Sequence, residues 1–239
     1  MARPGSIGRG CIVRKSLILI IFIFLFCRIS IAAPVYGTHM PKERRFTCGL
    51  EGNFIVDRNL DNDEGATSGD RYFFTLSYGI FSWLSFDGKI GVGDAGWHRI
   101  GADDLSYATN FAGGYGFRVR GYEIEEWGIK SVAGFQHISV HSDAKNQGGD
   151  KHDAIIDEWQ GSLVVSKDIG SLVPYFGTRY GTVDFIKWLN EHDRKRIQSE
   201  KYYGLIIGLD YWLSDKTKIN LECDFLDGEE FALGFSRDF

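Results

Sequence analysis

Two short groups of acidic and histidine residues have the types and the spacing that water-activating chemistry needs. Asp61 and Asp63 stand two residues apart, and so do Asp150 and His152. A pair of carboxylates, or a carboxylate beside an imidazole, can take a proton from water and turn it into a nucleophile. Such pairs are also common in acidic surface loops, and a solvated loop is the simpler interpretation of both groups.

A partial calcium-loop pattern overlaps the first of these groups. Oxygen-bearing side chains stand at its positions one, three, five and twelve, namely Asn59, Asp61, Asp63 and Asp70. The sixth position needs a glycine for its sharp turn and holds Glu64 instead. We therefore expect no metal and no cofactor. The chain also lacks the Gly-x-Ser-x-Gly sequence of a nucleophile elbow, and we expect that it is not an enzyme.

The elements that would position these residues are strands, and the last ten residues give the clearest example. Successive side chains of a strand point to opposite sides. One face of the segment Glu230 to Phe239 is large and apolar, with Phe231, Leu233, Phe235 and Phe239. The other face is small or polar, with Glu230, Ala232, Gly234, Ser236 and Asp238. The period of two predicts a strand whose apolar face must be covered.

This terminal strand resembles the C-terminal strand of bacterial outer-membrane β-barrel proteins, a class that includes small OmpA-like and OmpW-like barrels. The resemblance implies an assembly signal formed by Phe231, Leu233, Phe235 and Phe239. It also implies that the barrel-assembly machinery reads this signal before the segment pairs with the first strand. The expected partners are this machinery and outer-membrane lipid, and the expected location is the cell outer membrane.

The N-terminus has the features of a secretory signal. Residues 1–33 contain five basic residues and no acidic one, and an apolar run extends from Leu17 to Cys27. That run is too short to span a bilayer as a helix. Cleavage is expected between 33 and 37. Phe26 is too large for lipoprotein processing before Cys27. Without this segment the formal charge falls from −5 to −10, which argues against nucleic-acid binding.

Period-two alternation continues through the rest of the chain, which has 30 glycines, only 4 prolines and 15% aromatic residues. With the last strand it predicts ten strands, the other nine near 46–57, 71–80, 84–92, 107–120, 127–140, 154–166, 173–185, 203–212 and 219–225. The expected long links are 58–70, 96–106, 141–153 and 186–200, and the short ones are 81–83, 120–126, 167–172 and 213–217, with a further short link near 226–229. Long outer loops and short periplasmic turns are typical of outer-membrane barrels.

The predicted fold is all-β: a closed, antiparallel, up-and-down transmembrane β-barrel of about ten strands over residues 46–239. A soluble barrel or sandwich shows the same alternation. Aromatic girdles at the membrane interfaces favour the membrane: Trp83, Trp127 and Trp212 lie beside short links, and Tyr72, Tyr107 and Tyr202 beside long ones.

In a membrane barrel the polar face of each strand fills the lumen. We expect a lumen charge network of Glu51, Asp87, Lys89, Arg118, Lys130, Glu158, Arg179, Asp210, Glu222 and Asp224. Buried charges need partners, and about ten strands enclose little more than their own side chains. We therefore expect a salt-bridged plug, with a narrow channel for small solutes as the alternative. Cys48 and Cys223 would be about 9–10 Å apart across one strand, too far for a disulfide, and are expected as free thiols facing lipid.

Acid pairs near the outer rim of a ten-stranded barrel are similar to those of the omptin surface proteases. The match is incomplete because this chain is much shorter, and an omptin-like rim protease is the second alternative. The main expectation is a monomeric structural or surface-interaction protein.

Overall fold

The structure, a computed structural model, describes residues 36–147, 149–190 and 192–239. The predicted signal segment, 1–33, lies outside the described residues. The described chain is almost entirely strand, with one short 3-10 turn, η1 (Glu125–Trp127). The strands are β1 (Phe46–Asn59), β2 (Ala66–Phe81), β3 (Leu84–His98), β4 (Leu105–Ile124), β5 (Ile129–Gln147), β6 (Asp150–Lys167), β7 (Leu172–Leu189), β8 (His192–Gln198), β9 (Tyr203–Ser214), β10 (Thr217–Phe225) and β11 (Glu229–Asp238).

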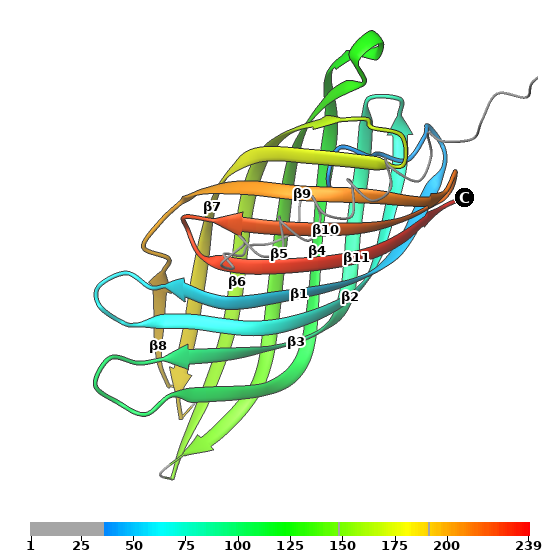
Figure 1. Ribbon diagram of the computed structural model, residues 1–239. Helices are drawn as coiled ribbons and strands as arrows, with labels where there is room; N and C mark the ends of the chain where they lie inside the picture. Colours follow the sequence, from blue (N-terminus) through cyan, green and yellow to red (C-terminus); the bar gives the residue numbers. More distant parts are fainter. Residues whose placement is uncertain (1–35, 148, 191) are drawn as a thin grey trace, which may run out of the picture.

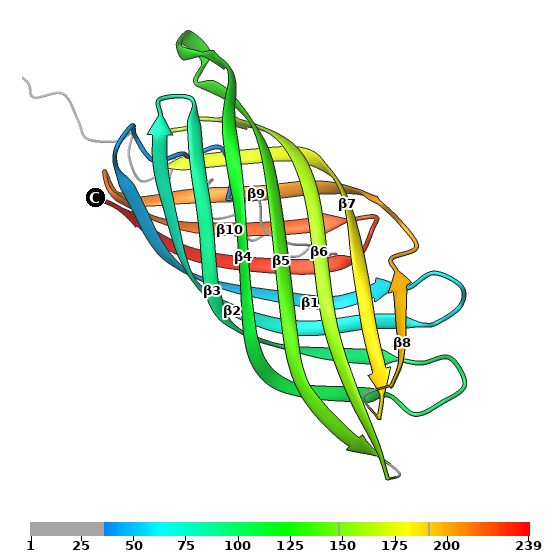
Figure 2. The ribbon, with the colours of Figure 1, turned by 180° about the vertical axis from the view of Figure 1, so that it is seen from behind.

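Ten of these strands form a closed antiparallel barrel. Each pairs with its neighbours in chain order, β7 pairs with both β6 and β9, and β1 pairs with β11 to complete the circle. β8 is an addition to this wall, because it pairs only with the far end of β7. The strands tilt strongly, so that β9, β10, β11 and β1 cross in front of β4, β5 and β6 in Figure 1 and behind them in Figure 2. The predicted fold class is confirmed.

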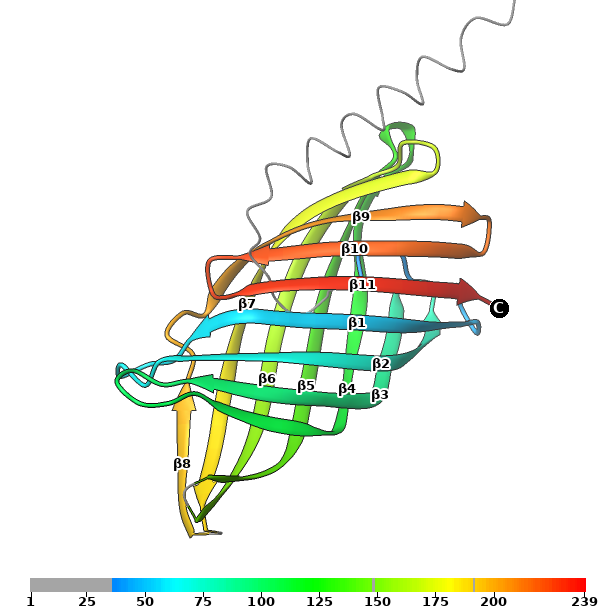
Figure 3. The same ribbon diagram turned by 60° about the horizontal axis from the view of Figure 1, so that its bottom comes forward.

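The expected long loops are mostly wrong, because the strands continue through them. β5 and β6 extend across most of 141–153, and β8 lies inside 186–200. The first two loops shrink to 60–65 and 99–104. These segments carry polar residues on both faces and so lack the alternation of the membrane-spanning parts. In Figure 3 β8 stands beside the extended end of β7, at one end of the barrel.

The apolar faces of the strands point outward. Leu205 is 47% exposed and Leu233 45%, whereas Glu222 is 1% exposed and Asp224 is fully buried. A soluble barrel would show the reverse, so that alternative is wrong. Among the described residues no helix has the length and apolarity to cross a bilayer.

Two β-bulges change which side chains face the lumen. In β1 the register with both neighbours shifts between Ile55 and Arg58, and Val56 and Asp57 are both exposed. Arg58 therefore points inward, although strict alternation from Ile55 would turn it out. In β4 the register with β5 shifts between Ala108 and Ala112, and Tyr107 becomes buried in the same way.

The girdle prediction is wrong at two positions. Tyr107 is 2% exposed and lies inside the barrel, because of the bulge in β4. Trp212 packs edge-on against His39 at 4.8 Å between ring centroids. Trp83 and Trp127 are at least half exposed, and both lie beside short turns as expected.

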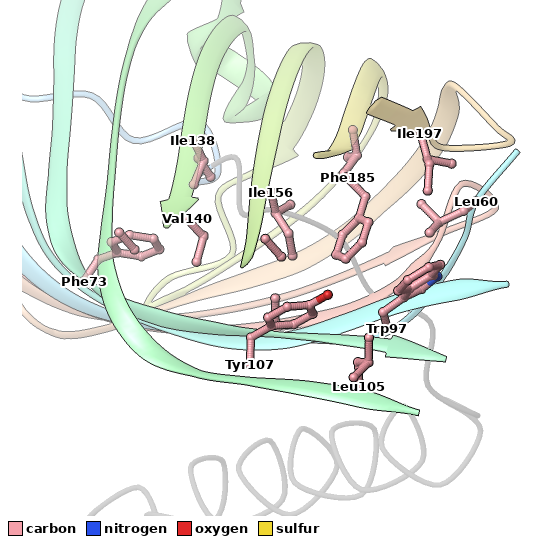
Figure 4. Packing of buried hydrophobic residues seen from close by; sticks show 14 residues of the cluster. Leu60, Phe73, Trp97, Leu105, Tyr107, Ile138, Val140, Ile156, Phe185 and Ile197 are labelled. Atoms are coloured by element: carbon pink, nitrogen blue, oxygen red, sulfur yellow. The ribbon is translucent and has the colours of Figure 1, made fainter. Parts of the chain in front are cut away.

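Part of the barrel interior is apolar, which the sequence analysis did not anticipate. Side chains from strands around the wall point toward one another there (Figure 4). The cluster consists of Leu60, Phe73, Ala95, Trp97, Leu105, Tyr107, Ala112, Ile138, Val140, Ala154, Ile156, Val183, Phe185 and Ile197. It fills the end of the barrel that carries the longer connections, and we call it the apolar layer.

Candidate functional site

The centre of the lumen is occupied by a carboxylate surrounded by three arginines. Glu158 on β6 contacts Arg58 at 3.2 Å and Arg71 at 2.9 Å. Arg179 approaches the same carboxylate at 3.5 Å, and Arg58 also pairs with Glu230 at 3.0 Å. All five side chains are at most 2% exposed. These contacts link β6 to β1 and β2 across the barrel.

Arg179 extends this network toward β10 and the short link that follows it. Its guanidinium lies 2.7 Å from Asp227 and 3.9 Å from Asp224. It also donates a 2.9 Å hydrogen bond to Gln160. A buried charge is stable only with such partners, so this arginine fixes three separate parts of the wall relative to one another.

Toward the short-turn end the lumen holds simpler ion pairs. They are Glu51 with Lys89 at 3.0 Å, Asp87 with Arg118 at 2.6 Å, and Asp210 with Lys218 at 2.7 Å. Asn220 then donates to Asp210 at 2.7 Å and to the Tyr175 hydroxyl at 2.8 Å. The Tyr175 hydroxyl donates to Glu222 at 2.6 Å. We call the central network and these pairs together the charged layer.

The charged layer contains nine of the ten residues predicted for it. The tenth, Lys130, lies at the short-turn rim, where it is 36% exposed and pairs with Asp168 at 2.7 Å. Alternation points Lys130 inward, but the strand begins at Ile129, so its side chain reaches the rim and not the interior.

Sequence reasoning missed several members of the network. Arg71 and Glu230 occupy the polar faces of predicted strands, and this signal was available. Arg58 had no such signal, because the bulge in β1 reverses its direction.

The segment 36–41 closes the short-turn end of the lumen. Lys89 lies 4.7 Å and Arg118 5.3 Å from the centre of the Tyr36 ring, which is cation–π geometry. Arg118 also donates a 2.5 Å hydrogen bond to the carbonyl of His39. The cavity left beside Tyr36 has a volume of about 20 Å³, room for a single water molecule. No pattern in the sequence predicts that this segment fills the end of the lumen.

The apolar layer closes the other end. The Phe185 ring points toward Trp97 and Tyr107 (Figure 4). Its centroid lies 5.6 Å from that of Trp97 and 6.2 Å from that of Tyr107. The Lys187 Nζ atom lies 3.5 Å from the centroid of the Trp97 ring and 3.3 Å from the Glu64 carboxylate. Lys195 also donates to Glu64, and this hydrogen bond holds the pKa of the carboxyl below its usual range.

The acid pairs predicted for proteolysis lie on different elements, the β1–β2 loop and the start of β6. Asp61 and Asp63 line an open groove at the β1–β2 loop. Asp150 accepts a 2.8 Å hydrogen bond from Asn190 at the tips of β6 and β7. No hydrogen bond or ion pair between described residues joins the two pairs.

A different group of side chains meets at the rim. The Ser68 hydroxyl lies 2.9 Å from Nε2 of His98, and Nδ1 of the same ring lies 3.0 Å from Asp104. The hydrogen bond from His98 holds the pKa of Asp104 below its usual range. The sequence pattern predicts loops at both Ser68 and His98, so it does not indicate their pairing across β2 and β3.

Residues 36–147, 149–190 and 192–239 contain no cluster of three or more His, Cys, Asp or Glu side chains suited to a metal ion. Cys48 and Cys223 form no disulfide within this part of the chain. Both are partly exposed on β1 and β10.

No protein-family model and no curated protein is similar to this chain. Solved structures are similar to it in fold. The transport unit of the autotransporter AIDA-I from Escherichia coli is 9% identical over 94% of this chain and 96% of its own, with a TM-score of 0.45. The translocator domain of NalP from Neisseria meningitidis is 9% identical over 84% and 89%, with a TM-score of 0.46. The outer membrane protease OmpT from Escherichia coli is 10% identical over 84% and 99%, with a TM-score of 0.45.

The closed wall with apolar residues outside and ionised residues inside defines the class: this chain has the fold of an outer-membrane β-barrel protein. These similarities concern the fold alone. They distinguish no narrower group, and neither an OmpA-like nor an OmpW-like membership follows from them.

Proposed function

We propose that this protein is a monomeric, non-conducting barrel of the outer membrane that serves as a structural or surface-interaction protein. The observation that supports this most is the filling of the lumen at three successive levels: the segment 36–41, the charged layer and the apolar layer. A solute would have to displace paired charges and a packed cluster to pass. The exposed apolar faces of the strands are suited to lipid.

Conductance in planar bilayers tests this proposal. The refolded protein is expected to insert without producing current steps, whereas a general porin in the same bilayer conducts. Heat-modifiable migration on a gel and flotation with liposomes verify that the inserted protein is folded. Reproducible current steps from the folded protein would favour the narrow channel and refute the proposed plug.

The terminal strand supports a role for the assembly machinery. Phe239 is 58% exposed, and its amide donates a 2.9 Å hydrogen bond to the carbonyl of Phe46 on β1. Phe239→Ala should reduce the folded, heat-modifiable protein in outer-membrane fractions severalfold. Ser236→Ala, a small change on the opposite face of the same strand, is the control and should have little effect. Equal losses for both variants would show that the assembly machinery does not recognise the aromatic terminus.

A further inference from the structure

We infer that Ser68, His98 and Asp104 form a hydrolytic site at the rim of the barrel, and that its substrate is a basic peptide. The three side chains stand in a continuous row, with 2.9 Å from the Ser68 hydroxyl to Nε2 of His98 and 3.0 Å from Nδ1 to Asp104. A serine on one ring nitrogen and a carboxylate on the other is the arrangement in which imidazole acts as a general base on a hydroxyl.

The strands position this row on the outside of the wall. Thr67 and Gly69 are buried toward the lumen, so Ser68 between them points outward. His98 ends β3, and Asp104 lies in the loop that leads to β4. The His98 and Asp104 side chains are 49% and 63% exposed. The site is therefore open to molecules outside the cell.

Gly96 leaves room at the nucleophile. It pairs directly with Ser68 across β2 and β3. A Cβ atom at this position would lie 2.4 Å from the Ser68 hydroxyl oxygen and 3.8 Å from Nε2 of His98. Any larger residue would displace the hydroxyl, whereas glycine keeps the space beside both atoms for a substrate carbonyl.

A groove with a volume of about 650 Å³ begins at His98. Its acidic lining includes Asp61, Asp63 and Glu200, and none of the described residues that line it is a lysine or an arginine. Backbone hydrogen bonds from Asp61 to Gln198 and from Glu200 to Asn59, 2.8 and 3.0 Å long, tie the β1–β2 loop to the end of β8. The groove is thus fixed in place, and its charge selects positively charged side chains.

The reaction follows from these positions. The Ser68 hydroxyl oxygen attacks the carbonyl carbon of a peptide bond, and its proton passes to Nε2 of His98. The imidazolium returns that proton to the leaving amine as the C–N bond breaks, which leaves an acyl ester on Ser68. Water then attacks the ester with His98 as base, releasing the acid and restoring the serine. Asp104 is a positioning residue, because it acts on the ring and not on the substrate.

Labelling with a fluorophosphonate probe, which phosphonylates activated serines with loss of fluoride, tests the nucleophile in the full folded barrel. We expect labelling that Ser68→Ala abolishes and His98→Asn slows about 100-fold. Asp104→Asn should slow it and Asp104→Glu should restore it. Ser139→Ala is the matched control. Ser139 also contacts a histidine, His141, at 3.2 Å, but within the described chain that ring has no carboxylate partner. Heat-modifiable migration confirms folding of each variant.

Hydrolysis of two coumarin-amide substrates, acyl-arginine and acyl-glutamate, tests the substrate class. The arginine substrate should react about tenfold faster, and neutralising Asp61, Asp63 and Glu200 together should abolish the preference. No labelling of the folded protein, or equal labelling after Ser68→Ala, would overturn the site. Equal rates for the two substrates would overturn the basic-peptide assignment. Neither result depends on whether the lumen conducts.

Discussion

The charged layer and the apolar layer both fill the lumen of the barrel, but through different interactions. In the charged layer each guanidinium needs a carboxylate at a defined distance, and Glu158 meets three of them from β1, β2 and β7. In the apolar layer Phe185 and its neighbours need only the correct volume. Buried ion pairs gain little over apolar packing in stability. The difference indicates that the charged layer sets which strands lie opposite one another, while the apolar layer stabilises the closed form.

Removal of the central carboxylate should have the largest effect. Glu158→Ala leaves Arg58, Arg71 and Arg179 facing one another without their shared partner, and we expect a loss of about 5 kcal/mol in the free energy of unfolding. Denaturant titration in detergent, followed by tryptophan fluorescence, measures it. Lys130→Ala is the control, since this ion pair at the rim is 36% exposed and should contribute below about 1 kcal/mol. Similar losses for the two variants would contradict the distinction between buried and rim charges.

Truncation of a side chain in the apolar layer should lower the free energy of unfolding by a smaller amount. Ile156 is fully buried, and Ile156→Ala is expected to lower the free energy of unfolding by about 3 kcal/mol through the lost transfer energy and the cavity. The same titration measures it, and Ile156→Val, with a loss of about 1 kcal/mol, serves as the graded control. If Ile156→Ala cost more than Glu158→Ala, the proposed ranking of the layers would be reversed.

The ion pairs of Glu64 with Lys187 and Lys195, beside the apolar layer, should contribute least to the stability of the fold. Their contribution should depend on pH. Lys195 holds the pKa of Glu64 below its ordinary value of 4.5, so this carboxylate stabilises the folded state above that pH. The contribution disappears as the pH falls from 4.5 through the lowered pKa. Protection of β8 amides from hydrogen exchange should decline in acid by the equivalent of less than about 1 kcal/mol. Glu64→Gln should remove this pH dependence, and its persistence in that variant would exclude Glu64 as the source.

Much of the wall could be predicted from the sequence because lipid imposes a strict period of two. Leu233 and Phe235 outward with Ala232 inward followed from alternation alone. The bulges could not be predicted, since Val56 and Asp57 look like any strand residues. The same alternation does not identify Ser68 and His98. Beyond the membrane both faces of a strand contact water, so a strand rich in polar residues resembles a loop. The rim site depends on the pairing of β2 with β3, which only the register reveals.

The bulge in β1 lets the strand hold one extra outward residue without changing the direction of Arg58. Val56 and Asp57 are both exposed, so substitutions at either would be well tolerated. Deleting one of them would remove the bulge, and plain alternation from Ile55 would still direct Arg58 inward to its ion pair with Glu230. The chain beside this arginine can therefore lose one residue and keep the central network of the lumen intact.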